Sequence, residues 1–327
     1  MHPNQLFIEK SEKILRTRPK GCCYLLYLDI TDFQYINFCY GTEAGDRLLQ
    51  AVNDYTAGLP FVLLCERLYS DYFLCILSFP GEAPDEKAVQ AVEHSLNGFM
   101  AEQQKLYPAC KLRFACGLCR TGTQELSHTI ESANLARKEA KRLDTGSAVL
   151  YSEELVQKTV TRYELEQTLN QAVREQRFCF YLQPKVDLTN GRIIGAEALA
   201  RRIGQDGTVI YPDSFLPVME SSGTVVELDL LICRQVCAFL SGRLRQGLPV
   251  VRTSVNLSRL HIKNKDTASS LHAIAQEYQI PPELLEFELT ETILLDELTG
   301  AKKLIDQLRT YGCLLYTSDA ADDTPCV

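Results

Sequence analysis

The sequence predicts an α/β protein of two domains. It has 327 residues, of which 46% are hydrophobic and 23% charged, an ordinary globular composition with enough chain for two sizeable cores. Short apolar runs typical of buried strands alternate with segments whose apolar residues recur at helical spacing. Between two such sets lies a long, charged, amphipathic stretch, residues 152–176, which we expect to be a stiff connector helix.

The first half predicts strands and helices in mixed order. After a polar N-terminal helix within residues 1–20, we expect strand 22–30, helix 42–55, a hairpin of strands 61–68 and 72–79, helix 85–107, strand 111–119, helix 126–143 and strand 148–151. The basic last turn of the 126–143 segment supports that helix, because cations favour a helix C-terminus. These elements make one domain, residues 21–151.

The second half predicts a repeated order of strand and then helix. We expect strands 178–188 and 192–200, helices 213–222 and 225–246, strand 250–256, helix 269–279, strand 285–289 and helix 296–311. Such alternation is typical of a parallel sheet or a barrel. We assign these elements to a second domain, residues 177–312.

Three oxygen-bearing side chains stand where apolar runs of the second half end. They are Glu197, Asn256 and Glu288. In a (β/α) barrel the active site lies at the C-terminal ends of the strands, whereas an isolated polar residue there usually just faces water. Two carboxylates and an amide, without His or Cys, suit Mg²⁺ or Mn²⁺ rather than Zn²⁺. Such ions serve phosphoryl chemistry, and Arg201 could grip a phosphate through its planar fork.

Charge and cysteine content exclude other classes. A net charge of -8 provides no electrostatic footprint for duplex nucleic acid. No apolar run approaches the roughly 18 residues of a membrane-spanning helix, so we expect a cytoplasmic protein. Several of the 13 cysteines lie in strand-like runs, where free thiols act as small hydrophobes. Cys116 and Cys119 have the spacing of a redox pair or half a zinc site, but no second pair lies nearby.

Five motifs of the second half, in order, resemble the EAL family of cyclic di-GMP phosphodiesterases. They are Tyr181-Leu-Gln-Pro184, Glu197-Ala-Leu-Ala-Arg201, Pro212-x-x-Phe215-x-Pro217-x-x-Glu220, Ser254-Val-Asn-Leu-Ser258 and Glu288-Leu-Thr-Glu291. The resemblance implies a TIM-type β/α barrel that opens cyclic di-GMP to the linear dinucleotide with two Mg²⁺ or Mn²⁺ ions, and a homodimer.

The same resemblance implies roles for individual residues. Glu197 and Glu288 match catalytic metal ligands, and Asn256 matches a further ligand. Three positions match substrate contacts, namely Gln183, Leu199 and Arg201. Glu291 matches a glutamate that holds a loop linking the metal site to dimerisation, a role compatible with that of a helix N-terminal carboxylate.

Residues 21–151 are similar to the GGDEF domain of diguanylate cyclases, an α+β fold with a mostly antiparallel central sheet. The similar segments are Leu28-Asp29-Ile30-Thr-Asp32-Phe33, Ile36-Asn37, Tyr40-Gly41, Gly45-Asp46 and Ala133-Asn-Leu-Ala-Arg-Lys-Glu-Ala-Lys141. The signature itself is replaced by Tyr69-Ser70-Asp71-Tyr72-Phe73, which lacks the two glycines and the second acidic ligand. We therefore expect cyclisation to be lost.

Four residues of this domain still match GTP-related positions of the family: Asp29, Asn37, Asp46 and Asp71. They favour a remnant site that senses GTP. The alternative is a purely structural domain that positions the connector helix.

The EAL resemblance ends near Gly312. The family continues with a strand ending in an aspartate pair, and then a lysine, whereas residues 313–327 have no counterpart and resemble read-through of a sequencing adapter. We expect a truncated barrel of four strands, in which strand 285–289 has a free edge. We expect this truncated domain to be prone to aggregation and to be inactive by itself. The parent protein is then a phosphodiesterase with a regulatory first domain; the alternative is a silent EAL domain that binds cyclic di-GMP or a protein partner.

Overall fold

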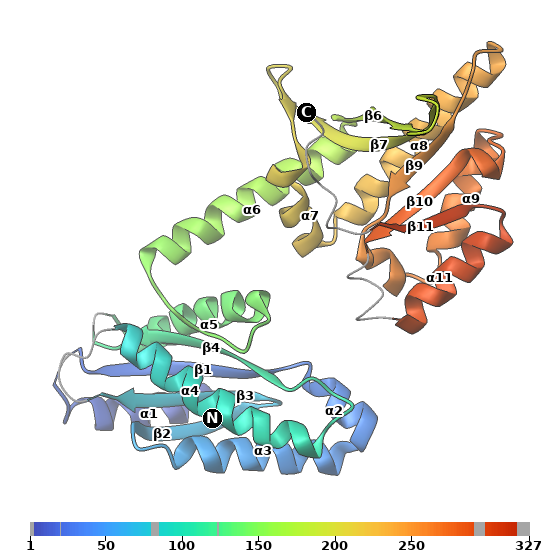
Figure 1. Cartoon of the computed structure of the whole chain (residues 1–327). Coiled ribbons are helices and arrows are strands. Elements are labelled where there is room, and N and C mark those ends of the chain that lie inside the picture. The colour runs from blue at the N-terminus through green and yellow to red at the C-terminus, as the bar shows by residue number, and fades with distance from the viewer. Residues whose placement is uncertain (1–2, 20, 80–84, 123, 291–297, 319–327) are drawn as a thin grey trace. The chain divides into compact units, whose positions relative to one another are not determined.

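A computed structural model describes residues 3–19, 21–79, 85–122, 124–290 and 298–318 (Figure 1). The chain forms two compact units, Met1–Thr159 and Val160–Val327. Each unit mixes helices and strands, which confirms the predicted α/β class. The predicted connector is the continuous helix α6 (Glu153–Arg174), within which the two units divide.

A five-stranded sheet forms the centre of the first unit. Its strands are β1 (Cys23–Thr31), β2 (Val62–Tyr69), β3 (Tyr72–Ser78), β4 (Arg113–Arg120) and β5 (Ala148–Leu150), in the order β2-β3-β1-β4-β5. Neighbouring strands are antiparallel except β4 and β5, which confirms the mostly antiparallel sheet. Every residue of the central strand β1 is buried, because helices cover both faces.

The helices of the first unit divide between the two faces of this sheet (Figure 1). They are α1 (Pro3–Leu15), α2 (Phe33–Tyr40), α3 (Thr42–Ala57), α4 (Asp85–Leu106) and α5 (Leu126–Leu143). α2, α3 and α4 share a core with Leu26 and Leu28 of β1, whereas α1 and α5 pack on the other face with Leu25 and Tyr27. The sequence analysis missed α2, a short helix with just two buried residues.

A glycine lets α5 approach β4 closely. A Cβ atom at Gly117 would lie 1.9 Å from the carbonyl oxygen of Ala133 and 2.3 Å from the backbone nitrogen of Arg137. Any larger residue would therefore push α5 away from the sheet.

The cysteines of β4 are core thiols, as predicted. Cys116 and Cys119 are buried, and burial raises the pKa of both thiols. Every cysteine that the structure describes is free rather than disulfide-bonded. These thiols therefore serve as small apolar side chains.

An open sheet forms the centre of the second unit. Its strands are β6 (Phe178–Val186), β7 (Ile193–Ile203), β8 (Val209–Ile210), β9 (Arg252–Asn256), β10 (Leu285–Thr290) and β11 (Leu314–Ser318). Their order is β11-β10-β9-β7-β6, with β8 paired to β7. β6 and β7 are antiparallel, whereas β7, β9, β10 and β11 run parallel. Over the described residues these strands do not close, as expected for an incomplete barrel.

The prediction of a free edge beside strand 285–289 is wrong. β11 pairs in parallel with residues 286–290 of β10, so that side of β10 is hydrogen-bonded. The sheet also has more than the four strands expected. Residues 314–317, Leu-Leu-Tyr-Thr, have high β-propensity. This local signal for a strand was missed because residues 313–327 have no counterpart in the EAL family.

Beyond α6, the described helices of the second unit are α7 (Leu216–Ser222), α8 (Val225–Arg245), α9 (Thr267–Glu277) and α11 (Leu298–Thr310). The predicted helix 213–222 is instead a 3₁₀ turn, Pro212–Ser214, followed by α7, because Phe215 leaves helical geometry with φ −126°. Two further 3₁₀ turns span Arg259–Lys263 and Pro282–Leu284. Residues of α8, α9 and α11 bury Leu285, Phe287 and Leu289 of β10.

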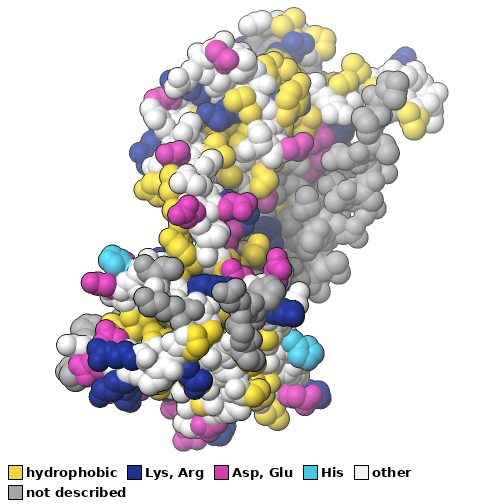
Figure 2. All heavy atoms as spheres, turned by 90° about the vertical axis from the view of Figure 1, so that its left-hand side faces the viewer, with side chains coloured by type: hydrophobic (Ala, Val, Ile, Leu, Met, Phe, Trp, Pro, Cys, Tyr) yellow, Lys and Arg dark blue, Asp and Glu magenta, His cyan; other side chains and the backbone are white. Residues whose placement is uncertain are grey.

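Charged side chains of both signs are spread over the described surface. On the face shown in Figure 2, Lys and Arg are interspersed with Asp and Glu. Even the long helix α8, which buries Leu228 and Ile232, carries Arg234 and Arg243. Within the described part of the chain, no helix is long and apolar enough to cross a membrane.

Candidate functional site

The three predicted oxygen donors gather on neighbouring parallel strands. Asn256 is the last residue of β9 and pairs in register with Glu288 of β10. Glu197 of β7 pairs with Ser254 of β9. The Asn256 amide nitrogen donates to Glu197 Oε1 at 2.7 Å. The sheet therefore brings two carboxylates and one amide to one place.

Glu197 does not lie where its strand ends, contrary to the prediction. β7 continues to Ile203, because residues beyond Glu197 pair with β6 on one side and, at the far end, with β8. Glu197 is only partly buried, which a strand with one open face permits. Pairing on both sides makes this carboxylate better fixed than one at a frayed strand end.

Lys185 is a site residue that the sequence analysis missed. Its Nζ donates to Glu288 Oε1 at 2.5 Å and to Glu286 Oε1 at 2.8 Å. These two glutamates are 9% and 5% exposed, so the lysine compensates buried negative charge. Burial lowers the pKa of Lys185, but the contacts with Glu286 and Glu288 outweigh it and raise the pKa. The sequence offered one signal, the spacing of two residues from Gln183, which places both side chains on one strand face.

The predicted substrate contacts share a face of β6 and β7 with Glu197. Glu197, Leu199 and Arg201 occupy alternate positions of β7, and alternate residues of a strand point the same way. Gln183 of β6 pairs directly with Glu197, and directly opposed residues also share a face. Gln183, Leu199 and Arg201 thus share one surface with Glu197.

Two tyrosine rings flank the guanidinium group of Arg201. Its Cζ lies 5.6 Å from the ring centroid of Tyr181 and 4.8 Å from that of Tyr211, both within cation–π range. Arg201 Nη1 also donates to the Ala200 carbonyl at 2.8 Å. The guanidinium plane is therefore oriented before any ligand binds.

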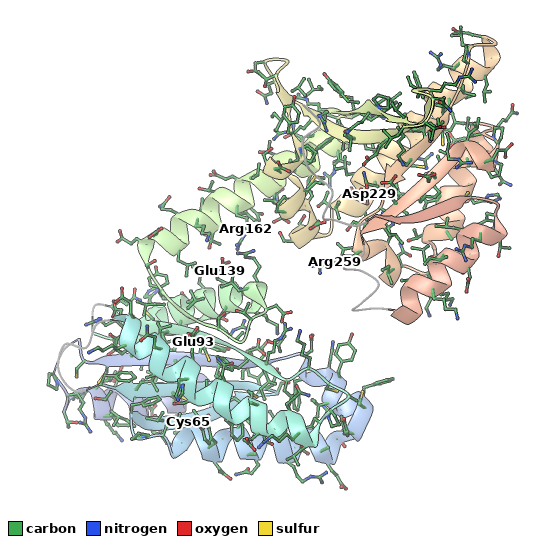
Figure 3. All side chains as sticks on the ribbon, viewed as in Figure 1. Cys65, Glu93, Glu139, Arg162, Asp229 and Arg259 are labelled. Carbon is green, nitrogen blue, oxygen red and sulfur yellow. The ribbon has the colours of Figure 1, made fainter. Side chains whose placement is uncertain are left out.

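A buried Asp–His pair anchors the loop that follows Asn256. Asp229, labelled in Figure 3, lies near the start of α8 and accepts hydrogen bonds from the Ser258 backbone N–H at 2.8 Å and from His261 Nε2 at 3.1 Å. His261 is 1% exposed. Burial raises the pKa of the Asp229 carboxyl, against the lowering effects of His261 and the Ser258 N–H. This pair fixes the start of the loop two residues beyond Asn256.

In the first unit, Asp29 is buried and paired with cations of α5. The side chain is 0% exposed, its Oδ2 contacts Arg137 Nη1, and Lys141 Nζ lies 2.8 Å away. Burial raises the pKa of Asp29, against the lowering effect of Lys141, while the neighbouring Asp71 adds to the rise. The guanidinium of Arg137 also lies 5.1 Å from the ring centroid of Tyr72. Asp29 and Asp71 are thus brought together beside built-in positive charge.

The other two GTP-related residues lie on α2 and α3. Asp46 is exposed on α3. Asn37 of α2 packs against Gly45, where a Cβ atom would lie 2.0 Å from its Oδ1. In the turn between β2 and β3, Ser70 adopts φ 49°, a backbone conformation that favours glycine. The turn therefore keeps a glycine-like backbone while carrying a side chain.

The residue types of the predicted ligand set are those that a hard divalent cation prefers. Glu197 and Glu288 carry carboxylate oxygens and Asn256 an amide oxygen, and Mg²⁺ and Mn²⁺ favour such ligands. Among the described residues, no group of three or more His, Cys, Asp or Glu side chains could hold a metal ion. Glu291 lies outside the described residues.

Comparison with protein families defines both units. Residues 3–146 match the family "Diguanylate cyclase, GGDEF domain", and residues 166–324 match the "EAL domain" family. The first match lies within the first unit and the second within the second unit. The chain is a GGDEF domain followed by an EAL domain.

Individual relatives align with most of the chain. The chain is 26% identical to the signaling protein YkoW of Bacillus subtilis over 90% of this chain and 37% of that protein. It is 24% identical to the cyclic di-GMP phosphodiesterase NbdA of Pseudomonas aeruginosa, over 97% of this chain and 40% of that protein. Its fold is similar to that of Vibrio cholerae LapD S helix-GGDEF-EAL bound to c-di-GMP, with a TM-score of 0.53 and 13% identity, covering 98% of this chain and 75% of that one. The chain spans less than half the length of these two curated relatives.

Proposed function

We propose that the EAL domain belongs to a phosphodiesterase that opens cyclic di-GMP to the linear dinucleotide with Mg²⁺ or Mn²⁺. The observation that carries this proposal is the hydrogen bond between Asn256 and Glu197, beside Glu288 on the next strand. This arrangement supports a metal site built from carboxylate and amide groups on paired strands. The name of NbdA and the ligand of the LapD structure support the choice of substrate.

Each side chain of the site has a distinct task in this proposal. Glu197, Asn256 and Glu288 would hold the metal, which when bound polarises a phosphate oxygen and activates water. Arg201 offers two N–H groups in one plane to a phosphate, and the rings of Tyr181 and Tyr211 already restrict its motion.

Two neighbours on the same face complete the substrate surface. Gln183 presents an amide that can donate and accept hydrogen bonds. Leu199 presents an apolar surface between Glu197 and Arg201. Polar recognition therefore surrounds one apolar contact, which suits a ligand with a flat base and a charged backbone.

We propose that the GGDEF domain is regulatory and makes no cyclic di-GMP. Tyr72 supplies no carboxylate, and Asp29 is already paired with Arg137. Asn37 and Asp46 remain as candidate GTP contacts. A rise in melting temperature when GTP is added to the chain would support GTP sensing, and an unchanged melting temperature would support a structural role.

The test of the proposed function is turnover of cyclic di-GMP by the gene product that contains the whole EAL domain. We expect the linear dinucleotide to form with Mn²⁺ and to be detected by chromatography. Binding of cyclic di-GMP without hydrolysis would instead identify a silent binding module. If the gene product neither binds nor hydrolyses cyclic di-GMP, the proposal is rejected.

A further inference from the structure

Lys185 crosses the face of the sheet to reach the proposed metal site. It starts on β6, whereas Glu286 and Glu288 lie on β10, with β7 and β9 between. Gly195, its cross-strand partner on β7, has no side chain, and a Cβ atom there would lie 3.7 Å from Lys185 Cδ. The aliphatic part of the lysine therefore passes beside Gly195 at van der Waals distance from where a Cβ atom would lie.

The charge balance around Glu288 depends on this lysine. Glu286 and Glu288 are two residues apart on β10, so both point to one face. Lys185 Nζ donates to one oxygen of each, at 2.8 Å and 2.5 Å. The second cation is looser, because Arg252 Nη1 lies 3.8 Å from Glu286 Oε2. Lys185 is therefore the closer of the two cations that pair with Glu286, and it also pairs with Glu288.

We propose that Lys185 is the resident counter-cation of the metal site. It holds the Glu288 carboxylate in place when no metal is bound, and its charge limits the affinity for a divalent cation. The inference rests on the proposed function, which makes Glu288 a metal ligand. Since Lys185 and the cation would share one carboxylate, they repel each other. Lys185 is thus a positioning residue that also sets metal affinity.

Two substitutions in the same ion pair separate this role from a structural one. In the metal-free chain, Lys185→Met leaves excess negative charge and is expected to bind Mn²⁺ about tenfold more tightly by isothermal titration calorimetry. Glu286→Gln removes a carboxylate and is expected to bind Mn²⁺ about tenfold more weakly. If the ion pair only stabilised the fold, both substitutions would weaken Mn²⁺ binding. Lys303→Met, at an exposed position of α11, removes the same charge and should bind as wild type.

A double variant covers the case in which Lys185→Met does not fold. Lys185→Met with Glu286→Gln removes one charge of each sign and is expected to bind Mn²⁺ within about threefold of wild type. Binding much weaker than that overturns the inference. If wild type binds Mn²⁺ and Lys185→Met binds equally or more weakly, only the inference fails. If neither wild type nor any variant binds Mn²⁺, the inference fails, whereas the proposed function is decided separately by turnover in the gene product that contains the whole EAL domain.

Discussion

Replacing Arg137 with methionine tests the buried charge balance of the first unit. The Arg137 side chain is 7% exposed and contacts the fully buried carboxylate of Asp29. Its guanidinium also lies 5.3 Å from the ring centroid of Tyr27 and 5.1 Å from that of Tyr72. The variant keeps Lys141, whose Nζ lies 2.8 Å from Asp29 and whose side chain is 41% exposed.

The expected cost follows from these contacts. Removing one partner of a buried ion pair costs about 3–5 kcal/mol, because the other charge stays desolvated. The remaining Lys141 places the estimate at the lower end, and the lost ring contacts add to it. We expect Arg137→Met to lower the free energy of unfolding of the first unit by about 3 kcal/mol. For a unit of this size the melting temperature falls by about 10 °C.

The loss should also depend on pH in a defined direction. Burial raises the pKa of Asp29, and Arg137 is one of the groups that oppose this rise. Without Arg137 the folded-state pKa rises further above the unfolded value. The resulting penalty is present at neutral pH and disappears as the pH falls and Asp29 takes up a proton.

Native-state hydrogen exchange of the β1 amides measures this free energy for the first unit alone. Arg16→Met is the control, because its pair with Glu12 is 79% and 52% exposed and should contribute little. A deficit below about 1 kcal/mol in Arg137→Met, or one that grows toward acid pH, would refute the reasoning.

Three further outcomes are expected. Asp229→Ala leaves the Ser258 N–H and His261 without their acceptor and should lower the free energy of unfolding by about 2 kcal/mol in a urea titration; an unchanged midpoint would show that the pair is not structural. Arg201→Ala should raise KM for cyclic di-GMP about tenfold with a smaller change in kcat, and the reverse pattern would contradict a binding role. The chain incubated with GTP and Mg²⁺ should form no cyclic dinucleotide, since Tyr72 supplies no carboxylate; any such product on chromatography would restore the cyclase assignment.

Local sequence patterns predicted most elements but missed those with weak local signals. β1 and the hairpin of β2 and β3 could be predicted, because their apolar runs are bounded by turn residues. α2 has two buried residues over eight, too few to show a helical period. β11 has a strand-like composition, but its partner is fixed by the sheet order rather than by its own residues.

The same division holds for the site. Glu197, Asn256 and Glu288 stand in motifs that can be read along the chain, although the position of Glu197 within β7 required the pairing with β6 and β8. Lys185 contacts a glutamate 103 residues away, and Arg137 an aspartate 108 residues away. Such contacts follow from strand order and helix packing, which no short motif encodes.

The most direct test of the proposed phosphodiesterase is the rate of cyclic di-GMP hydrolysis with Mn²⁺ in the gene product that contains the whole EAL domain, compared with its Glu197→Ala variant. Loss of one metal-binding carboxylate removes several kcal/mol of transition-state stabilisation, so turnover should fall at least about 1000-fold. Glu277→Ala, which loses only the exposed pair with Arg234, should keep the wild-type rate. Near-normal turnover in Glu197→Ala would contradict the metal site on which the proposed function depends.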